Sequence, residues 1–310
     1  MGRAHWSAFL GCRMKRGIIQ SRGLGDIIIA LPIAKHYHDL GDEIYWPICE
    51  EFHSSFVDNV PWVNWIPLTT DPQGLFFLDG PRAALAKEGI PEEDQLYLYQ
   101  YLSSMPELTD PELFAVLKFD QYKYWVSQVP FTKKWTLADC ITRNENRESE
   151  LQSKLQLSKP YAVVHLTGSS GRVDLDLSWI PVGTQIVDID QHLGWSIFDW
   201  IPILEGAEIF VGLDSVFANM VDSLAIPINE KYWIRRSPWD VTPVLGQVWT
   251  MVETDLPTGD PQRVEPAKMA VEKAKALAAQ AAKASSNVMM TAPFQASGAI
   301  PKDFMYALKK

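Results

Sequence analysis

The chain has 310 residues, of which 47% are apolar, and it carries a formal net charge of −10. The apolar content supports packed cores and excludes global disorder, and the length suffices for two domains. An acidic protein has no electrostatic footprint for non-specific nucleic-acid binding. The charge is uneven, because eight Lys/Arg and three Asp/Glu fall in residues 262–310, which leaves −15 on the residues before them.

Signals for redox state and targeting are sparse. Cys12, Cys49 and Cys140 are widely spaced, so they indicate free thiols in a reducing compartment, and we expect a cytoplasmic protein. No apolar stretch of the sequence approaches the length of a membrane span. Residues 1–13 lack the apolar core of a signal peptide, and we interpret them as a dispensable extension ahead of Met14.

The first predicted unit is a buried strand over residues 17–20 followed by a helix over residues 26–39. Glycines in the joint Ser21-Arg22-Gly23-Leu24-Gly25-Asp26 let backbone approach a ligand closely, and we expect Arg22 and Gly25 beside a cleft. Ile28 stands where a dinucleotide-binding fingerprint has its third glycine.

Asp26 is the informative residue of this joint. A helix N-terminus favours the ionised carboxylate, and a carboxylate at the mouth of a strand–helix unit can accept a proton from a substrate hydroxyl. The alternative is that Asp26 only caps the helix.

Strands predicted over residues 43–47 and 63–68, with a helix over 50–59 between them, continue the alternation and indicate a parallel, doubly wound sheet. We expect residues 69–94 to be irregular, 95–101 to form an edge strand or short helix, and 110–117 to be helical.

Residues 118–135 are dense in aromatic residues and lysine. They either line an acceptor site, with Lys123 and Arg143 facing anionic groups, or form a packed connector with solvated lysines. A charged helix over 143–157 then ends at the breaker Ser158-Lys159-Pro160, a domain boundary.

A strand predicted over residues 161–166 runs into Thr167-Gly168-Ser169-Ser170-Gly171-Arg172. Small residues followed by an arginine suit a phosphate, although a Gly/Ser surface turn has the same composition. We interpret His165 as a strand-end histidine whose hydrogen bonds are satisfied.

Further strands are expected over residues 185–190, 207–212 and 226–228. A capping box, Ser196 to Asp199, starts a helix that reaches residue 204. A second helix, over 216–224, follows Asp214 and Ser215, and its first N–H groups form an anion site. Asp214 orients the loop or accepts a sugar hydroxyl; the alternative is a plain cap. Residues 239–249 return toward the first domain, and 266–284 form an Ala/Lys-rich helix.

Two stretches resemble the heptosyltransferase-type glycosyltransferases of family nine. The first is the order Gly25-Asp26, Leu31-Pro32 and Glu43-Ile44-Tyr45-Trp46; the second is a strand, Gly212-Leu213-Asp214-Ser215, and a helix. The resemblance implies a GT-B fold, in which two Rossmann-like doubly wound α/β domains face a cleft. It places an acceptor-side domain in residues 14–157, a nucleotide-sugar-binding domain in 158–261, and a helix with a tail in 262–310.

The same resemblance implies roles for particular residues. Asp26 is the catalytic base, and Lys123 lies at the acceptor site or cleft. The nucleotide-sugar donor is bound by residues of two loops: Thr167, Gly168, Ser169, Ser170 and Arg172 in one, and Asp214, Ser215 and Val216 in the other. No metal and no cofactor are expected, since the nucleotide-sugar is a substrate. The chain departs from the family by a short segment before Gln185, and by Ala218 and Asn219 where the family has a histidine.

The expected function is that of an inverting glycosyltransferase, which moves a sugar from a nucleotide-sugar donor to a hydroxyl of a surface glycan or lipopolysaccharide-type acceptor. One alternative is a viral type of DNA modification, in which hydroxymethylated bases are the acceptor. Another is a catalytically degenerate GT-B module that only binds a nucleotide or glycan.

Overall fold

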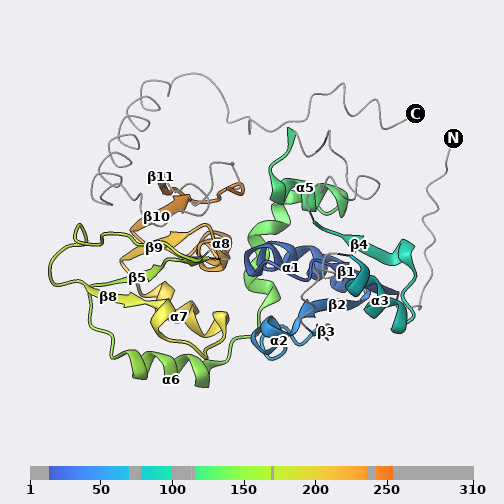
Figure 1. Ribbon diagram of the computed structural model, residues 1–310, viewed down its shortest axis with the longest axis horizontal. Coiled ribbons are helices and arrows are strands. Elements are labelled where there is room, and N and C mark those ends of the chain that lie inside the picture. Colours follow the sequence, from blue (N-terminus) through green and yellow to red (C-terminus); the bar gives the residue numbers. More distant parts are fainter. Residues whose placement is uncertain are drawn as a thin grey trace.

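The computed structural model describes residues 14–69, 78–99, 113, 116–168, 171–235 and 242–253. Two α/β lobes lie side by side, each built on a parallel sheet (Figure 1). Within these residues, no helix combines the length and the apolar character that crossing a membrane requires.

The first lobe is a four-stranded sheet in the order β3-β2-β1-β4, and all its pairings are parallel. Its strands are β1 (Lys15–Ile19), β2 (Glu43–Cys49), β3 (Val63–Leu68) and β4 (Gln95–Tyr97). Its helices are α1 (Leu24–Asp39), α2 (Glu50–Phe56), α3 (Asp79–Lys87) and α5 (Phe119–Val126). Both faces of the sheet are covered, because Ile18 packs in one apolar cluster while Ile19 packs with Leu85 of α3 in another.

The second lobe is a five-stranded parallel sheet in the order β11-β10-β9-β5-β8. Its strands are β5 (Tyr161–His165), β8 (Gln185–Asp188), β9 (Ile209–Leu213), β10 (Glu230–Arg235) and β11 (Thr250–Glu253). Its helices are α6 (Glu145–Leu155), α7 (Ile201–Glu205) and α8 (Val216–Ser223). A small antiparallel hairpin, β6 (Thr167–Gly168) with β7 (Gly171–Arg172), follows β5.

Each sheet reverses its winding direction at one place. In the first lobe the chain moves from β1 outward to β3 and then returns to add β4 on the other side of β1. In the second lobe it adds β8 on one side of β5 and β9 on the other. Ligands of open α/β sheets bind outside the carboxyl ends of the strands at such reversals. The fold therefore predicts ligand contacts after β1 and β4, and after β5 and β9.

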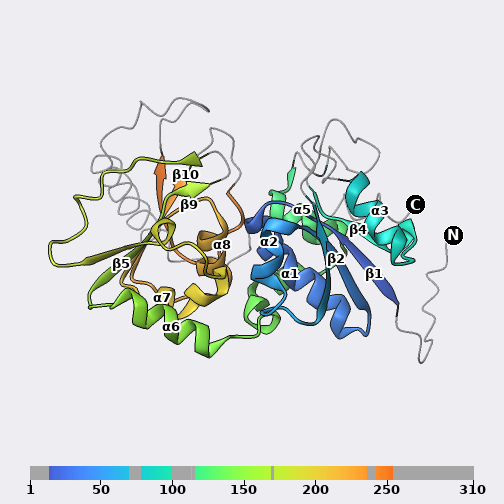
Figure 2. The ribbon, with the colours of Figure 1, turned by 60° about the horizontal axis from the view of Figure 1, so that its bottom comes forward.

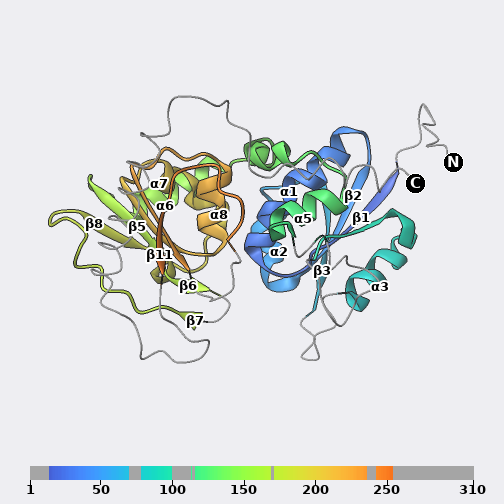
Figure 3. The ribbon, with the colours of Figure 1, turned by 90° about the horizontal axis from the view of Figure 1, so that it is seen from above.

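Helix α1 lies between the two lobes and faces α8 (Figures 2 and 3). Its residues 27–34 are all buried, which explains why this helix is apolar around its whole circumference. A single apolar cluster includes residues of both lobes, and Phe56 of α2 meets Phe198 edge to face across the boundary, with ring centroids 5.5 Å apart. The two lobes therefore share an apolar cluster at their boundary, and each has a further cluster of its own.

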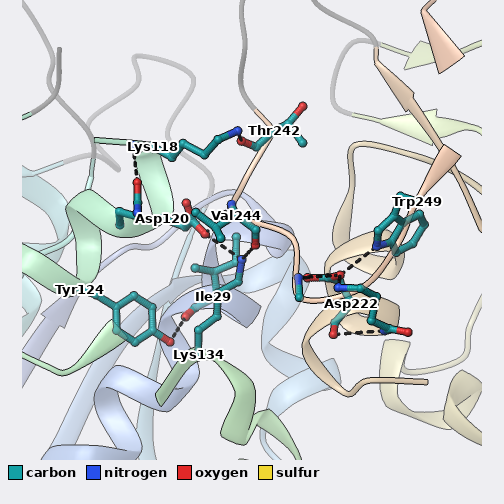
Figure 4. Close-up of polar contacts among 12 residues, drawn as sticks. Ile29, Lys118, Asp120, Tyr124, Lys134, Asp222, Thr242, Val244 and Trp249 are labelled. Carbon is teal, nitrogen blue, oxygen red and sulfur yellow. Dashed lines mark hydrogen bonds and ion pairs between the residues drawn. The ribbon is translucent and has the colours of Figure 1, made fainter. Parts of the chain in front are cut away.

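Residues 242–249 pass from the second lobe to the first and back (Figure 4). Lys118 Nζ donates to the Thr242 carbonyl, and the buried carboxylate of Asp120 accepts from the Val244 N–H. Lys134 Nζ pairs with Asp120 at 2.7 Å and also donates to the Val244 carbonyl. The predicted return of this stretch toward the first domain is confirmed by these contacts.

Two predictions about elements are wrong, and one strand was missed. Residues 69–94 contain the helix α3, which forms because its Ala-rich sequence favours a helix and Leu85 is buried against the sheet. No strand forms at 226–228, since Ile226 turns back to donate to the Val221 carbonyl, and β10 begins at Glu230 instead. The strand β11 was not predicted. The extension 1–13 and the tail 262–310 lie outside the described residues, as does most of the helix predicted over 110–117.

Candidate active site

Asp26 lies in the first turn of α1, next to the residues of the first lobe that approach α8. The N-cap of α1 is Gly23, whose φ of 77° lies in the left-handed region that glycine adopts without strain. Asp26 is therefore the third residue of the helix, and the alternative that it is the N-cap is wrong. Its side chain is 39% exposed, and Oδ1 lies 3.0 Å from the ammonium of Lys123.

Buried aromatic residues bind the backbone of residues 20–22, just before α1. The hydroxyl of Tyr99, just after β4, accepts from the backbone N–H groups of Ser21 and Arg22 at 3.0 and 3.1 Å. The indole of Trp46 donates to the carbonyl of Gln20 at 3.0 Å. Burial raises the pKa of Tyr99, so this phenol stays protonated. The path of the backbone before α1 is thus determined by tertiary contacts as well as by its glycines.

Lys123 does not line an open acceptor site as predicted. Only 1% of its side chain is exposed, because it reaches from α5 to the residues that follow β1 and β4. Its ammonium donates to Gln20 Oε1 and to the Leu98 carbonyl, at 2.7 and 2.8 Å, in addition to its contact with Asp26. Arg143, which was also expected to face anionic groups, pairs with Glu148 and Glu205 instead.

The second lobe contributes a histidine at its own reversal point. His165 ends β5, and its Nδ1 lies 2.9 Å from Ser215 Oγ, while Nε2 lies 3.4 Å from Asp190 Oδ1. Burial is the largest influence on this imidazole and lowers its pKa, although Asp190 and Asp188 act in the opposite direction. The interpretation of His165 as a satisfied strand-end histidine is confirmed.

Ser215 precedes α8 in the N-cap position, but its hydroxyl pairs with His165 and does not cap the helix. The first N–H groups of α8 therefore receive no acceptor from this side chain, as an anion-binding helix N-terminus requires. The neighbouring Asp214 is buried, and its N–H donates to the Ile234 carbonyl at the end of β10.

The guanidinium of Arg172 bridges two acidic residues, Asp188 at the end of β8 and Asp190 two residues further on. It lies 2.5 Å from Asp188 Oδ2 and 2.6 Å from Asp190 Oδ2. These carboxylates offset its charge, and Asp190 links it to His165. Thr167 and Gly168 are partly exposed in the hairpin that carries Arg172, whereas Ser169 and Ser170 lie outside the described residues.

The two lobes meet where these groups lie. A Cβ added to Gly25 would come within 3.0 Å of Asn219 Nδ2, 3.5 Å of the carbonyl carbon of Ser215 and 3.6 Å of the Val216 nitrogen. The absence of a side chain at Gly25 thus lets the N-terminus of α1 approach the N-terminus of α8. Asp26 follows Gly25 directly, so the structure brings the predicted base close to the predicted anion site.

Sequence reasoning missed three residues that belong to this region. Gln20 binds Lys123, Asp190 joins His165 to Arg172, and the Asn219 amide donates to the Ser215 carbonyl at 2.8 Å. Two of them could have been found from their place at the carboxyl ends of strands, since Gln20 directly follows β1 and Asp190 lies just beyond β8.

Comparison with known proteins gives matches at the level of structure. No protein-family model and no curated protein matches the sequence. A family 9 glycosyl transferase from Veillonella parvula DSM 2008 superposes with a TM-score of 0.50 and 9% identity, over 86% of this chain and 97% of that one. Glycosyltransferase TibC from enterotoxigenic E. coli H10407 matches with a TM-score of 0.47 and 12% identity, over 82% of this chain and 67% of that one. The E. coli heptosyltransferase WaaC, solved with ADP, matches with a TM-score of 0.40 and 14% identity, over 87% and 100% of the two chains.

The parallel sheets of this chain, each with one reversal point, are those of two doubly wound domains. The predicted fold class is confirmed: the chain has the GT-B fold and resembles the family nine glycosyltransferases.

Proposed function

We propose that this chain is an inverting glycosyltransferase, which moves a sugar from a nucleotide-sugar donor to a hydroxyl acceptor. The observation that carries the proposal is the approach of α1 to α8 at Gly25. It puts the partly exposed carboxylate of Asp26 beside the N-terminus of α8. The side chain of Ser215, the N-cap residue of α8, does not cap this helix. A carboxylate suits the deprotonation of an acceptor, and the N–H groups at a helix N-terminus suit a diphosphate. The GT-B fold supports the same reading at the level of architecture.

In the proposed reaction, Asp26 takes the proton of the acceptor hydroxyl while the hydroxyl oxygen attacks the anomeric carbon. The bond from that carbon to the diphosphate oxygen breaks, and the nucleoside diphosphate leaves with the electron pair. Direct attack on the face opposite the leaving group inverts the configuration at the anomeric carbon. The N–H groups at the start of α8, including that of Val216, offset the charge on the leaving diphosphate without a metal ion.

Other residues of the second lobe complete the proposed donor site. Thr167 and Gly168 approach the donor from the hairpin, and Arg172 balances the acidic pair at the end of β8. Ser215 and Asp214 bound the diphosphate site from β9. Arg22, which is exposed beside the α1 turn, lies on the acceptor side.

We propose a glycan of the surface or lipopolysaccharide type as the acceptor. The formal charge of −10 disfavours a duplex of nucleic acid as the partner of the whole chain. We place the reaction in the cytoplasm, and Cys49 and Cys140, which are buried free thiols, agree with a reducing compartment.

The test is the substitution Asp26→Asn, assayed with a panel of nucleotide-sugars by release of nucleoside diphosphate. We expect turnover to fall roughly 10²- to 10⁴-fold while donor affinity changes little, because only the proton acceptor is removed. Lys123 keeps Gln20 and the Leu98 carbonyl as acceptors, so we expect the free energy of unfolding to fall by only about 1–3 kcal/mol.

Asp39→Asn provides the matched control, since Asp39 is an exposed carboxylate at the other end of the same helix and pairs only locally, with Lys35. This variant should retain full turnover. Wild-type transfer rates in the Asp26→Asn protein would rule out the mechanism.

A further inference from the structure

Lys123 is a buried lysine whose ammonium meets three oxygen atoms. Its Nζ lies 2.7 Å from Gln20 Oε1, 2.8 Å from the Leu98 carbonyl oxygen and 3.0 Å from Asp26 Oδ1. An ammonium group has three N–H donors and no acceptor, so each donor has a partner here. Gln20 is itself anchored, because its amide donates to the Arg22 carbonyl at 2.8 Å. The position of the Lys123 charge is therefore tightly constrained.

The second oxygen of Asp26 is constrained by a different feature. A Cβ added to Gly23 would come within 2.7 Å of Asp26 Oδ2. This carboxylate oxygen therefore lies over the backbone of Gly23, in space that only a glycine leaves open. With Oδ1 bound to a buried ammonium, Oδ2 is the oxygen left to face a substrate.

A second buried lysine, Lys134, forms an ion pair in which both partners are buried, and it serves as a comparison. Lys134 is also 1% exposed and pairs with Asp120, but that carboxylate is 0% exposed and accepts from the Val244 N–H as well. Asp26 differs because 39% of its side chain is exposed, at the boundary between the lobes. A pair with one partner buried and the other partly exposed suits the orientation of a reactive group.

We propose that Lys123 is a positioning residue for Asp26: it holds Oδ1 and so presents Oδ2, over Gly23, as the atom that accepts the acceptor's proton. This inference rests on the proposed function for its catalytic part. Its geometric part, the orientation of the carboxylate by Lys123, holds whatever reaction occurs.

The test combines Lys123→Met with Asp26→Asn in a double-mutant cycle. We expect Lys123→Met to lower kcat roughly 10- to 10²-fold with an unchanged Kd for nucleoside diphosphate, because a small misplacement of a reacting group has effects of this size. In the Asp26→Asn background the same substitution should have no further effect on kcat, since the group that it positions is already inactive. Lys134→Met is the control; it should reduce stability by removing a similarly buried charge but leave kcat unchanged.

An equal loss of kcat in both backgrounds would overturn the proposal and leave Lys123 a structural residue. If Lys123→Met does not fold, Lys123→Gln replaces it, because an amide can still donate to Gln20 or Leu98 but carries no charge for Asp26. If the wild-type chain transfers no sugar, the proposed function fails, and crystal structures of the wild type and the Lys123 variant decide the geometric part. A carboxylate that stays over Gly23 in the variant would refute it.

Discussion

Asp222 of α8 is the main anchor of the segment that crosses between the lobes, and replacing it should destabilise the protein strongly. Its carboxylate is 2% exposed and accepts from the N–H groups of Gly246 and Gln247, at 2.9 and 3.1 Å. It also accepts from the indole of Trp249 at 2.8 Å (Figure 4). These are three charge-assisted hydrogen bonds to one buried group.

The magnitude follows from these bonds. A hydrogen bond to a charged group contributes about 1.5–3 kcal/mol, and a buried donor that loses its acceptor keeps its desolvation penalty. The Gly246 and Gln247 amides are only partly buried, so water can replace part of the loss. We therefore expect Asp222→Ala to lower the free energy of unfolding by about 3–5 kcal/mol. Asp222→Asn should cost about half as much, because its amide keeps one acceptor oxygen.

Urea unfolding followed by circular dichroism measures this loss from the change in midpoint at constant slope. Asp39→Ala is the control, since this exposed carboxylate at the end of α1 pairs with Lys35 one turn earlier. We expect the control to lose less than about 1 kcal/mol. A comparably small loss in Asp222→Ala would show that the crossing segment does not depend on this anchor.

Two further predictions concern the second lobe. Arg172→Ala should weaken binding of a nucleoside diphosphate about tenfold or more by calorimetry, because Asp188 and Asp190 would then face the anion without a balancing charge; unchanged affinity would exclude Arg172 from the donor site. Burial lowers the pKa of His165. As the pH falls below about 6.5, the unfolded chain therefore takes up a proton on this residue before the folded protein does. This group should then lower the free energy of unfolding by at most about 1.4 kcal/mol per pH unit. His165→Asn should flatten that dependence between about pH 7 and 5 in thermal or urea unfolding, and an unaltered slope would assign the effect to other groups, such as His36, whose pKa burial also lowers.

The elements that the sequence predicted well are those with a local physical signal. The first strand–helix unit follows from an apolar run, two glycines and an apolar helix, and the capping box at Ser196 follows from residue spacing alone. The wrong predictions concern elements whose structure depends on tertiary contacts. Ile226 to Ile228 has the composition of a strand, but Ile226 continues the turn after α8, and only the tertiary structure shows that β10 begins later.

The same distinction applies to the candidate site. Asp26 was identified as a candidate because it follows a glycine-rich joint before a helix and because that joint resembles the start of the family nine glycosyltransferases. The burial of Lys123 was not foreseeable, since a lysine among aromatic residues is compatible with an exposed or a buried side chain. Its partners, Gln20 and Leu98, come from two other strand ends, and only the parallel order of β1 and β4 brings them together. Pairings of this kind depend on sheet topology, which a single sequence does not specify.

The apolar cluster common to both lobes has a consequence for how the protein unfolds. Phe198 of the second lobe packs on Phe56 of the first, and α1 is buried on the side that faces α8 as well as on its own sheet. Separating the lobes would expose this apolar surface to water at about 25 cal/mol for each Å². Unfolding of one lobe should lower the free energy of unfolding of the other, because each lobe buries part of its neighbour's apolar surface. The division into two domains is therefore a property of chain topology, and we expect the two lobes to unfold in one cooperative transition.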